Sequence, residues 1–533
     1  MEYDRSSSKE KWTIMMYMRD FKLMTTYAYA LRSSSKLTTE NINDILIDME
    51  RKGIYNPRNG GSTFTGKFKS IQIAWYMFGY YNKNRERGEE KKMVFTPLGN
   101  LLLDNLDDEE KTAKIFLTML FANGFRQPFS KMDQRFNIFA YRLVFKLLRD
   151  KRLNYILYDD EMFYLVMFMK TITEDAYEEL VEDILKLRAV DPYEKLKWFK
   201  KYERVCGLAC HEWRYTKGML ESAGIIKIHN DHKNRSIGKL IYGSINKKTG
   251  RPNAVRKYVE DYVTLKSDII DLVDILLEKY HYYDLPFPED EISGKFNSDM
   301  IVEMYSFYPQ KLLIALGMDT REDKAIAEML NIANNVNYYS HEETEGGTNF
   351  EFAICDAFNM FRDVEAKRIA GAGNPDIECL YYPENENVKK FDIEAKARKT
   401  KLIEINPRRL RTHRTMIGSK YTMIVAPNYA IGVLEDIKGE QSVIIKSATL
   451  ANYIYQSILQ YGREISYIFL EEIIDENMGG DITELVNNYV YSNFGHGAED
   501  INVKKNPSFR IDMVNRTDAG YNLQVRENYG LEN

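Results

Sequence analysis

Two acidic residues and one lysine in the last third of the chain have the types and the spacing of a divalent-cation site. Asp376 ends a glycine-rich stretch, and Glu394 and Lys396 follow it with one residue between them. We expect strands over 377–382 and 388–396, joined by a turn-rich segment at 383–387. Paired residues of an antiparallel hairpin are symmetric about its turn, and positions 376 and 394 average to 385, the middle of that segment. The two carboxylates should therefore face each other across neighbouring strands.

This spacing would suit the hydrolysis of a phosphodiester. Facing carboxylates repel each other unless a cation lies between them, and carboxylate oxygens favour Mg2+ or Mn2+. A cation held there polarises a phosphodiester and lowers the pKa of bound water. Lys396 shares a strand face with Glu394, so its ammonium would orient the water or stabilise charge on the phosphate. The sequence thus predicts Asp376 and Glu394 as metal ligands and Lys396 as a catalytic group.

Other interpretations of these residues remain open. The hairpin could be a surface feature with ordinary charges. Asp392 is a rival ligand because it shares the face of Glu394, and a bulge of one residue would change which acid points inward. Gly371 and Gly373 would ease a close backbone approach to the site.

The elements that position this hairpin predict an α/β domain over 346–533. A helix is expected over 349–361, with one apolar face and with Glu351 at the edge of that face. A buried-type strand over 421–426, a short strand over 443–446 and a helix from Ser447 follow. The polar segment 340–348 precedes them and is the best domain boundary in the chain.

Positive charge is concentrated in two segments, although the chain as a whole has a net charge of -5. One segment follows Lys396, and Glu404 is its only acid; the other spans 231–257, and Asp231 is its only acid. Such segments suit contact with phosphates, although each could also be a solvated surface. The residues expected to contact a polyanion are Lys233, Arg235, Lys247, Lys248, Arg251, Arg408, Arg409, Arg411 and Arg414.

The first 345 residues are predicted to be mainly helical, in three parts. Residues 1–110 end with a short strand followed by Thr96-Pro-Leu-Gly99, which is typical of a winged-helix unit. Residues 111–260 contain helical stretches, then expected helices over 198–208 and 211–223 with Gly224 as the terminating residue, which indicates a second winged-helix-like unit. A helical linker over 261–345 completes this region.

Composition limits the class of protein. Four cysteines in 533 residues indicate a reducing compartment, and no signal segment or membrane-spanning apolar run is evident, so an intracellular protein is expected. Cys206, Cys210, His211, His229 and His232 could form a zinc site, or they could be buried cysteines with surface histidines. The spacing matches no common structural zinc module, which favours the second interpretation.

Four motifs carry a resemblance to a known family. They are Phe350-Glu-Phe352, Asn374-Pro-Asp376, Glu394-Ala-Lys396 and Tyr421-Thr-Met-Ile-Val-Ala-Pro427, and together they resemble the PD-(D/E)XK nuclease core. The layout looks like type IIS restriction endonucleases of the AlwI and FokI kind, including related strand-nicking enzymes. The resemblance implies a multidomain α+β protein with N-terminal winged-helix recognition and a C-terminal cleavage domain that has a mixed sheet.

The resemblance also implies an activity and its requirements. The chain would be a Mg2+-dependent type II site-specific deoxyribonuclease, with Mn2+ as a substitute, cutting double-stranded DNA near an asymmetric site. Asp376 and Glu394 would hold the metal, Lys396 would be the catalytic lysine and Glu351 an accessory acid. A transient homodimer, a cognate DNA methyltransferase and a prokaryotic cytoplasm are implied as well. A nicking endonuclease, and a DNA-binding regulator with an inactive nuclease fold, are the alternatives.

Overall fold

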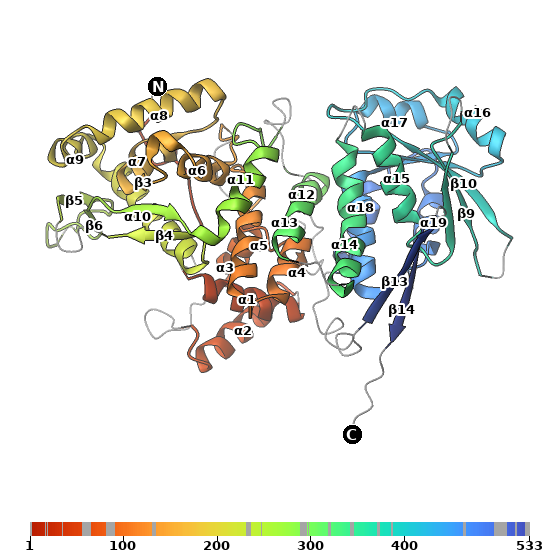
Figure 1. Ribbon diagram of the computed structural model, residues 1–533, viewed down its shortest axis with the longest axis horizontal. Coiled ribbons are helices and arrows are strands. Elements are labelled where there is room, and N and C mark those ends of the chain that lie inside the picture. Colours follow the sequence, from red (N-terminus) through yellow and green to blue (C-terminus); the bar gives the residue numbers. More distant parts are fainter. Residues whose placement is uncertain are drawn as a thin grey trace. The chain divides into compact units, whose positions relative to one another are not determined.

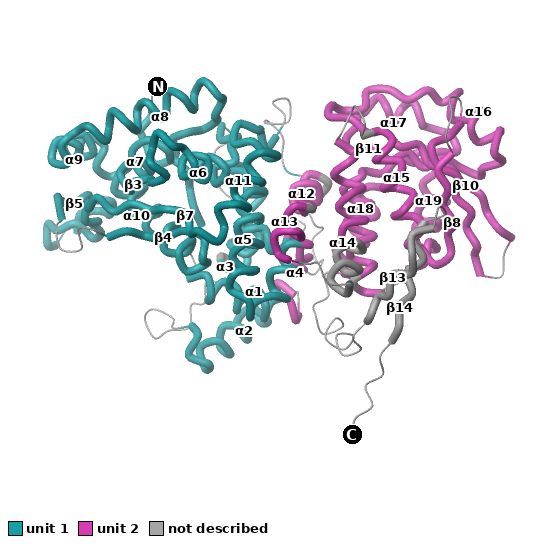
Figure 2. The backbone as a smooth tube through the Cα atoms, viewed as in Figure 1, with its two compact units in different colours: residues 1–31, 38–79, 98–296 teal, residues 32–37, 80–97, 297–533 magenta. Residues whose placement is uncertain are grey.

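The computed structural model places the chain in two compact units, each of which is described by itself (Figure 2). Unit 1 comprises residues 1–31, 38–79 and 98–296, and unit 2 comprises residues 32–37, 80–97 and 297–533. The structure describes residues 3–15, 18, 20–34, 36–55, 66–81, 91–129, 135–230, 236–246, 248–287, 296, 298–317, 321–341, 346–369, 374–384, 387–461, 465–494, 509–517 and 520–527. The predicted four-part division at 110, 260 and 345 stays a prediction.

Unit 1 is mainly helical, with short strands (Figure 1). Its strands form a three-stranded antiparallel sheet in the order β3-β7-β4 and a separate hairpin of β5 and β6. The elements of the N-terminal half are α1 (Phe21–Ser34), α2 (Thr39–Arg51), α3 (Gly66–Trp75), β1 (Gly79–Tyr80), β2 (Val94–Phe95), α4 (Pro97–Asp104), α5 (Glu109–Ala122), α6 (Ala140–Leu148), η1 (Lys151–Leu153), β3 (Leu157–Tyr158), α7 (Asp159–Tyr164), η2 (Val166–Phe168), α8 (Glu174–Arg188), α9 (Pro192–Lys201), α10 (Glu203–Ser222), β4 (Ile226–His229), β5 (Gly238–Ile241), β6 (Val255–Tyr258), β7 (Tyr262–Leu265), η3 (Ser267–Ile269) and α11 (Ile270–Lys279).

The prediction of two helices over 198–208 and 211–223 is wrong, because α10 spans the expected break between them. This helix runs without interruption from Glu203 to Ser222, so the break between two helices lies at Tyr202 and not near residue 210. Buried Cys206, Cys210 and Trp213 lie on one side of α10, which extends its packed face across the expected turn. The predicted stop at Gly224 is confirmed: its φ is +80°, a conformation that favours glycine.

Unit 2 contains a five-stranded sheet in the order β12-β11-β10-β9-β8 (Figure 1). The sheet is mixed, because β9 is antiparallel to both of its neighbours, β8 and β10, while β10, β11 and β12 are parallel. The elements are α12 (Ser298–Tyr305), α13 (Gln310–Ala315), α14 (Arg321–Ser340), α15 (Gly346–Phe358), β8 (Val364–Arg368), β9 (Ile377–Tyr381), β10 (Lys389–Ala395), α16 (Pro407–Ile417), β11 (Thr422–Ala426), α17 (Ile431–Ile437), β12 (Ser442–Lys446), α18 (Ser447–Tyr461), α19 (Ile468–Glu476), α20 (Thr483–Asn493), β13 (Phe509–Thr517) and β14 (Gly520–Glu527). The expected mixed sheet of the C-terminal region is therefore present.

The two faces of this sheet are covered by different helices. On one face, Phe391 of β10 stacks on Tyr421 and lies against Phe358 of α15. On the other face, Leu410 of α16 and Val433 of α17 join a buried cluster with residues of β11 and β12. Side chains alternate between faces along a strand, so Asp392 and Glu394 lie on the face that α16 and α17 cover. Phe391 and Ile393 lie on the opposite face, and both are buried.

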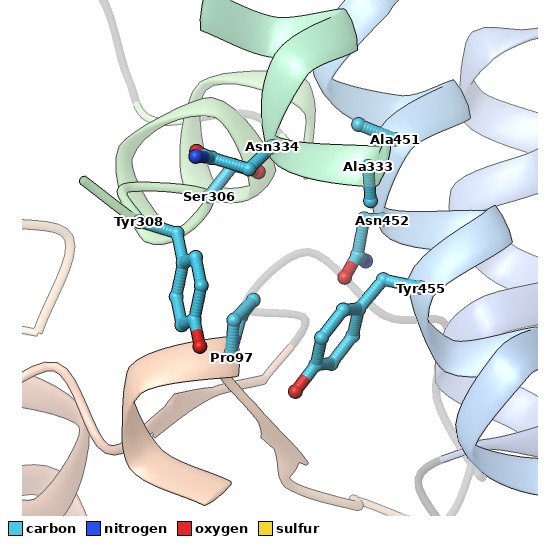
Figure 3. A pocket seen from close by; sticks show the side chains of 8 residues that line it. All are labelled: Pro97, Ser306, Tyr308, Ala333, Asn334, Ala451, Asn452 and Tyr455. Atoms are coloured by element: carbon cyan, nitrogen blue, oxygen red, sulfur yellow. The ribbon is translucent and has the colours of Figure 1, made fainter. Parts of the chain in front are cut away.

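A small pocket lies among the helices of unit 2 (Figure 3). Its lining residues are Pro97, Ser306, Tyr308, Ala333, Asn334, Ala451, Asn452 and Tyr455. No carboxylate, cysteine or histidine is among them, so this pocket offers no group for acid–base or metal chemistry. Within the described part of the chain, no helix is both long and apolar enough to cross a membrane.

Candidate active site

The register of β9 and β10 brings Asp376 and Glu394 opposite each other, as the symmetry about the turn predicts. The last pair of the ladder is Ile393 with Ile377, and the next pair in the same register is Glu394 with Asp376. Asp376 lies just before β9, and its Oδ2 accepts a hydrogen bond of 2.8 Å from the backbone N–H of Ala395. This bond ties the loop before β9 to the end of β10 and fixes the carboxylate beside Glu394.

The ammonium of Lys396 lies between the two carboxylates. Its Nζ is 2.5 Å from Oε1 of Glu394 and 3.9 Å from Oδ2 of Asp376. The Glu394 side chain is only 2% exposed, whereas Asp376 is 17% and Lys396 25% exposed. The three groups therefore converge where Asp376 and Lys396 are partly accessible to solvent and Glu394 is buried beneath them.

The electrostatics of Asp376 reflect two negative charges held close together. Burial raises the pKa of Asp376 to about 6, and the neighbouring Glu394 contributes to this increase. Lys396 and the Ala395 N–H oppose the increase, and Glu351 adds to it. Lys396 alone thus does not compensate for the charge, and a divalent cation would lower the free energy of the ionised pair.

Glu351 of α15 lies close enough to this pair to raise the pKa of Asp376. Its Oε2 accepts a hydrogen bond of 2.5 Å from Nε of Arg368 on β8, and its side chain is 19% exposed. The predicted helix-borne acid is therefore in the electrostatic range of Asp376. Its direct partner in the structure is an arginine.

The residues present fit a magnesium ion held by two carboxylates. Among the described residues there is no group of three or more His, Cys, Asp or Glu side chains that could hold a metal. Mg2+ commonly uses only one or two protein carboxylates and keeps water and phosphate oxygens as its other ligands. The hard oxygen atoms of Asp376 and Glu394 suit such an ion.

Asp392, the rival ligand, is buried deeper on the same face. Its side chain is fully buried, and burial raises its pKa to about 7. Its partner in the parallel ladder is Thr422, and Arg414 lies close enough to lower its pKa. The contacts of Lys396 go to Asp376 and Glu394, which favours those two acids as the site.

The sequence of α16 sets where this helix begins and ends, and which of its side chains face the site. It begins at Pro407 after Asn406, whose side chain accepts a 3.2 Å hydrogen bond from the N–H of Arg409, and it ends at Gly418 with φ of +72°. Arg409 and His413 lie one turn apart on the same face. Arg409 Nη2 is 3.7 Å from Oε1 of Glu394, and His413 Nδ1 is 3.5 Å from Oε2.

The predicted basic residues of α16 do not share one environment. Arg408 is exposed, and Arg411 is exposed while pairing with Glu440 at 3.2 Å. Arg414 is buried, and its guanidinium donates to Thr422 and Ser442 at 3.2 Å each. The expectation that Arg414 contacts a polyanion is therefore corrected: position 414 is one turn after buried Leu410, so its side chain faces the sheet.

The second basic segment forms the β5–β6 hairpin of unit 1. Lys248 and Arg251 are exposed in the connection between its strands, whereas Lys233, Arg235 and Lys247, like Gly371 and Gly373, lie outside the described residues. Lys239 and Lys257 are directly opposite each other in the ladder and both are exposed. Like charges in this arrangement repel each other, so the pair would be stabilised by an anion.

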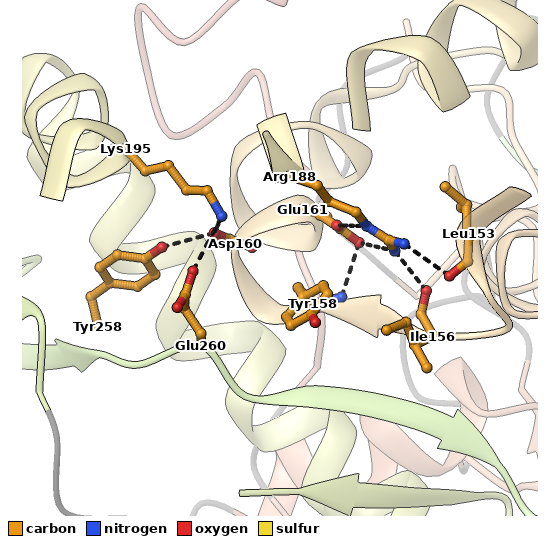
Figure 4. A network of polar contacts seen from close by, with 9 residues as sticks. All are labelled: Leu153, Ile156, Tyr158, Asp160, Glu161, Arg188, Lys195, Tyr258 and Glu260. Carbon is orange, nitrogen blue, oxygen red and sulfur yellow. Dashed lines mark hydrogen bonds and ion pairs between the residues drawn. The ribbon is translucent and has the colours of Figure 1, made fainter. Parts of the chain in front are cut away.

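Unit 1 fixes this hairpin through buried charges of α7 (Figure 4). Asp160 accepts hydrogen bonds from Tyr258 of β6 at 2.8 Å and from Lys195 of α9 at 3.0 Å. The adjacent Glu161 pairs with Arg188 of α8 at 2.6 Å, and burial raises its pKa to about 7. The network thus anchors the buried face of the hairpin and leaves its lysines outward.

Two residues of the site were not singled out from the sequence. They are His413, which lies against Glu394, and Arg368, which pairs with Glu351. The spacing of Arg409 and His413 by four residues after the Asn-Pro helix start could have placed both on the face toward the sheet. Of the cysteines and histidines considered for zinc, His232 lies outside the described residues, and the four that are described belong to no metal-binding group. Cys206 and Cys210 are buried, and His211 accepts a hydrogen bond from Arg256.

Comparisons with known proteins support a relation over most of the chain. Residues 7–280 match the family described as "Type II restriction endonuclease HgaI, N-terminal domain". The type II restriction enzyme HgaI of Avibacterium volantium is 35% identical over 490 residues, which cover 91% of this chain and 98% of that protein. Among solved structures, restriction endonuclease FokI aligns with 87% of this chain and 98% of its own at 9% identity and a TM-score of 0.24. FokI bound to DNA aligns with 90% and 96% at 11% identity and a TM-score of 0.23.

Proposed function

Since the chain belongs to the HgaI family of type II restriction endonucleases, we propose that it hydrolyses DNA phosphodiesters at the site formed by Asp376, Glu394 and Lys396. The observation that carries this proposal is the convergence of two opposed carboxylates and one ammonium at the end of β10. We propose Mg2+ as the cofactor, with Mn2+ as a substitute. When bound, the ion supplies Lewis-acid activation of the phosphodiester and of the attacking water.

Side chains of the chain would bind the ion, position its ligands and stabilise charge on the phosphate. Asp376 and Glu394 would hold the ion, and the Ala395 N–H would keep Asp376 in place. Lys396, which is partly accessible, would move from Glu394 to the phosphate and stabilise the charge that develops there. Glu351 would add negative charge to the site as an accessory acid.

We assign the sheet of unit 2 to a PD-(D/E)XK cleavage core within 346–533. The strand order, the parallel β10–β11 pair and the acidic residues at the ends of β9 and β10 support this assignment. We further propose 1–110 and 111–260 as winged-helix-like recognition units, with 261–345 as a linker. Lys248 and Arg251, with Lys233, Arg235 and Lys247, would contact phosphates on the recognition side, and Arg408, Arg409 and Arg411 would do so beside the cleavage site.

The number of strands cut depends on the number of sites. One chain carries one Asp376–Glu394–Lys396 set among its described residues, so a double-strand break needs a transient second copy or two successive nicks. A strand-nicking endonuclease is therefore the second candidate. In either case, the host DNA would need protection by a methyltransferase with the same specificity. The intact set of three residues argues against an inactive, purely DNA-binding regulator.

A plasmid assay tests the proposal. Purified protein and supercoiled plasmid are incubated with Mg2+, Mn2+ or EDTA, alongside the Asp376→Ala variant. We expect discrete linear fragments for a double-strand cutter and open circles for a nickase, with no cutting by the variant although its DNA gel shift is retained. Plasmid that stays supercoiled with every divalent ion would favour the regulator, and a variant that loses DNA binding and cutting together would count against the role of Asp376.

A further inference from the structure

Glu394 is held by different partners at its two carboxylate oxygens. Oε1 faces Lys396 at 2.5 Å and Arg409 at 3.7 Å, which directs it toward the opening shared with Asp376. Oε2 faces Nδ1 of His413 at 3.5 Å on the inner side. Both Oε2 and Nδ1 are fully enclosed, and among the described residues neither atom makes a hydrogen bond, so each is available to the other across 3.5 Å.

The other ring nitrogen of His413 determines where its proton lies. Nε2 is 3.4 Å from Nε of Arg409, which donates to it. A guanidinium can only donate, so Nε2 must be the acceptor nitrogen of the ring. The ring hydrogen of the neutral tautomer then lies on Nδ1, where it points at Oε2 of Glu394.

We propose that His413 is a positioning residue for the proposed catalytic carboxylate, acting through a hydrogen bond from Nδ1 to Oε2 of Glu394. This inference rests on the function proposed above. Glu394 has a flexible side chain. Lys396 at one carboxylate oxygen and His413 at the other hold it so that Oε1 stays turned toward Asp376. Removing the donor leaves a buried carboxylate oxygen without a partner and frees the side chain to turn, so divalent-cation affinity falls.

Three substitutions separate this role from simple packing. His413→Asn places its amide donor near the position of Nδ1 and keeps the hydrogen bond to Glu394. His413→Gln places its amide near Nε2, on the side of Arg409, and His413→Leu has no donor. All three fill part of the same buried space, so a packing role predicts similar losses for all, whereas the positioning role predicts that Asn alone rescues.

The experiment measures Mn2+ binding to the full-length chain without DNA, from the decrease of the free-ion electron paramagnetic resonance signal. We expect His413→Leu and His413→Gln to raise the Mn2+ Kd by about 10-fold or more, and His413→Asn to stay within about 3-fold of wild type. Met416→Ala, an exposed change on the same helix, is the control and should leave Kd unchanged. The rate of single-turnover cleavage should decrease in the variants in the same order as Mn2+ affinity, and it should recover at high Mn2+ concentration. The Asn and Gln variants should have similar DNA affinity and similar Tm.

Asp376→Asn distinguishes failure of this inference from failure of the proposed function. If wild type has no Mn2+ site that Asp376→Asn removes, the proposed metal pair and the role of His413 both fall. If that site exists, two results would overturn the role of His413 alone. One is that His413→Leu binds Mn2+ as tightly as wild type does, and the other is that His413→Asn and His413→Gln lose affinity equally. Should the Leu variant not fold, the contrast between Asn and Gln still decides.

Discussion

Replacing Asp376 by Asn should make the metal-free protein more stable while it abolishes cleavage. Burial and the nearby Glu394 raise the pKa of Asp376 from 3.8 to about 6, so the folded protein binds this proton more tightly than the unfolded chain does. Protonation of Asp376 thus stabilises the fold fully below pH 3.8, and this contribution is lost as the pH rises through about 6. The Asn side chain cannot ionise, and its carbonyl oxygen can still accept from the Ala395 N–H.

The size of the effect follows from the shift. A difference of about 2 pKa units corresponds to about 3 kcal/mol above pH 7 and to roughly half of that at pH 5. For a unit of this size the larger value corresponds to roughly 5–10 °C in Tm. We therefore expect the Asn variant to melt higher at pH 8 in EDTA, and the difference to shrink as the pH is lowered to 5.

Differential scanning calorimetry of both proteins in EDTA at pH 5, 6, 7 and 8 provides the measurement. Asp475→Asn is the control, because this exposed acid pairs with Lys420 at 2.9 Å and should contribute about 0–1 kcal/mol at most. Adding Mg2+ at pH 8 should raise the Tm of wild type and leave Asp376→Asn unchanged, since only wild type binds the ion well. A difference that is absent at pH 8, or equally large at every pH, would refute the electrostatic reasoning.

Three further predictions concern other parts of the molecule. Lys396→Met should lower single-turnover cleavage by about 100-fold or more while the DNA Kd changes little, because the ammonium acts on the developing phosphate charge; equal decreases in binding and cleavage would contradict this. The double variant Lys248→Ala with Arg251→Ala should reduce the slope of log K for DNA binding against log salt by about 1.8, which is roughly 0.9 for each phosphate that the hairpin no longer neutralises. Lys186→Ala on α8 is the control and should leave the slope unchanged. An unchanged slope in the double variant would exclude the hairpin from the DNA interface. Gly207→Val should destabilise unit 1 by about 1–3 kcal/mol, since a Cβ there meets the Ile241 carbonyl oxygen at 2.9 Å. Gly218→Ala in the same helix should be neutral or stabilising, because a Cβ there meets nothing within 4 Å. Calorimetry of both variants tests the difference.

The hairpin and its neighbours were predictable because their signals are local. The apolar face of α15, the alternation in β10 and the turn between β9 and β10 depend on residues close in sequence, and symmetry about that turn gave the pairing of Asp376 with Glu394. The stop of α10 at Gly224 and the N-cap of α2 at Thr38 follow from local backbone chemistry in the same way. Such features need no knowledge of the rest of the fold.

Other features depend on contacts between distant segments. The local pattern indicated two helices over 198–208 and 211–223, but the structure has one continuous helix from Glu203 to Ser222, in which Gly207 allows Ile241 of β5 to approach closely. The run of arginines after Lys396 gave no sign that Arg414 is buried against Thr422 and Ser442 while Arg408 stays exposed. Only the packing of α16 on the sheet decided which of these cations can reach solvent.

By itself, the sequence determined which acids and which lysine could share one end of a hairpin, because residue types and a two-residue strand period fix that geometry. The tertiary structure alone decided how deeply each group is buried and what lies behind it. Glu394 became the enclosed floor of the site, with His413 at its back, because α16 folds over the same face of the sheet. Burial and the charges brought near by folding determine pKa values and side-chain orientation, and neither can be read from a linear order of residues.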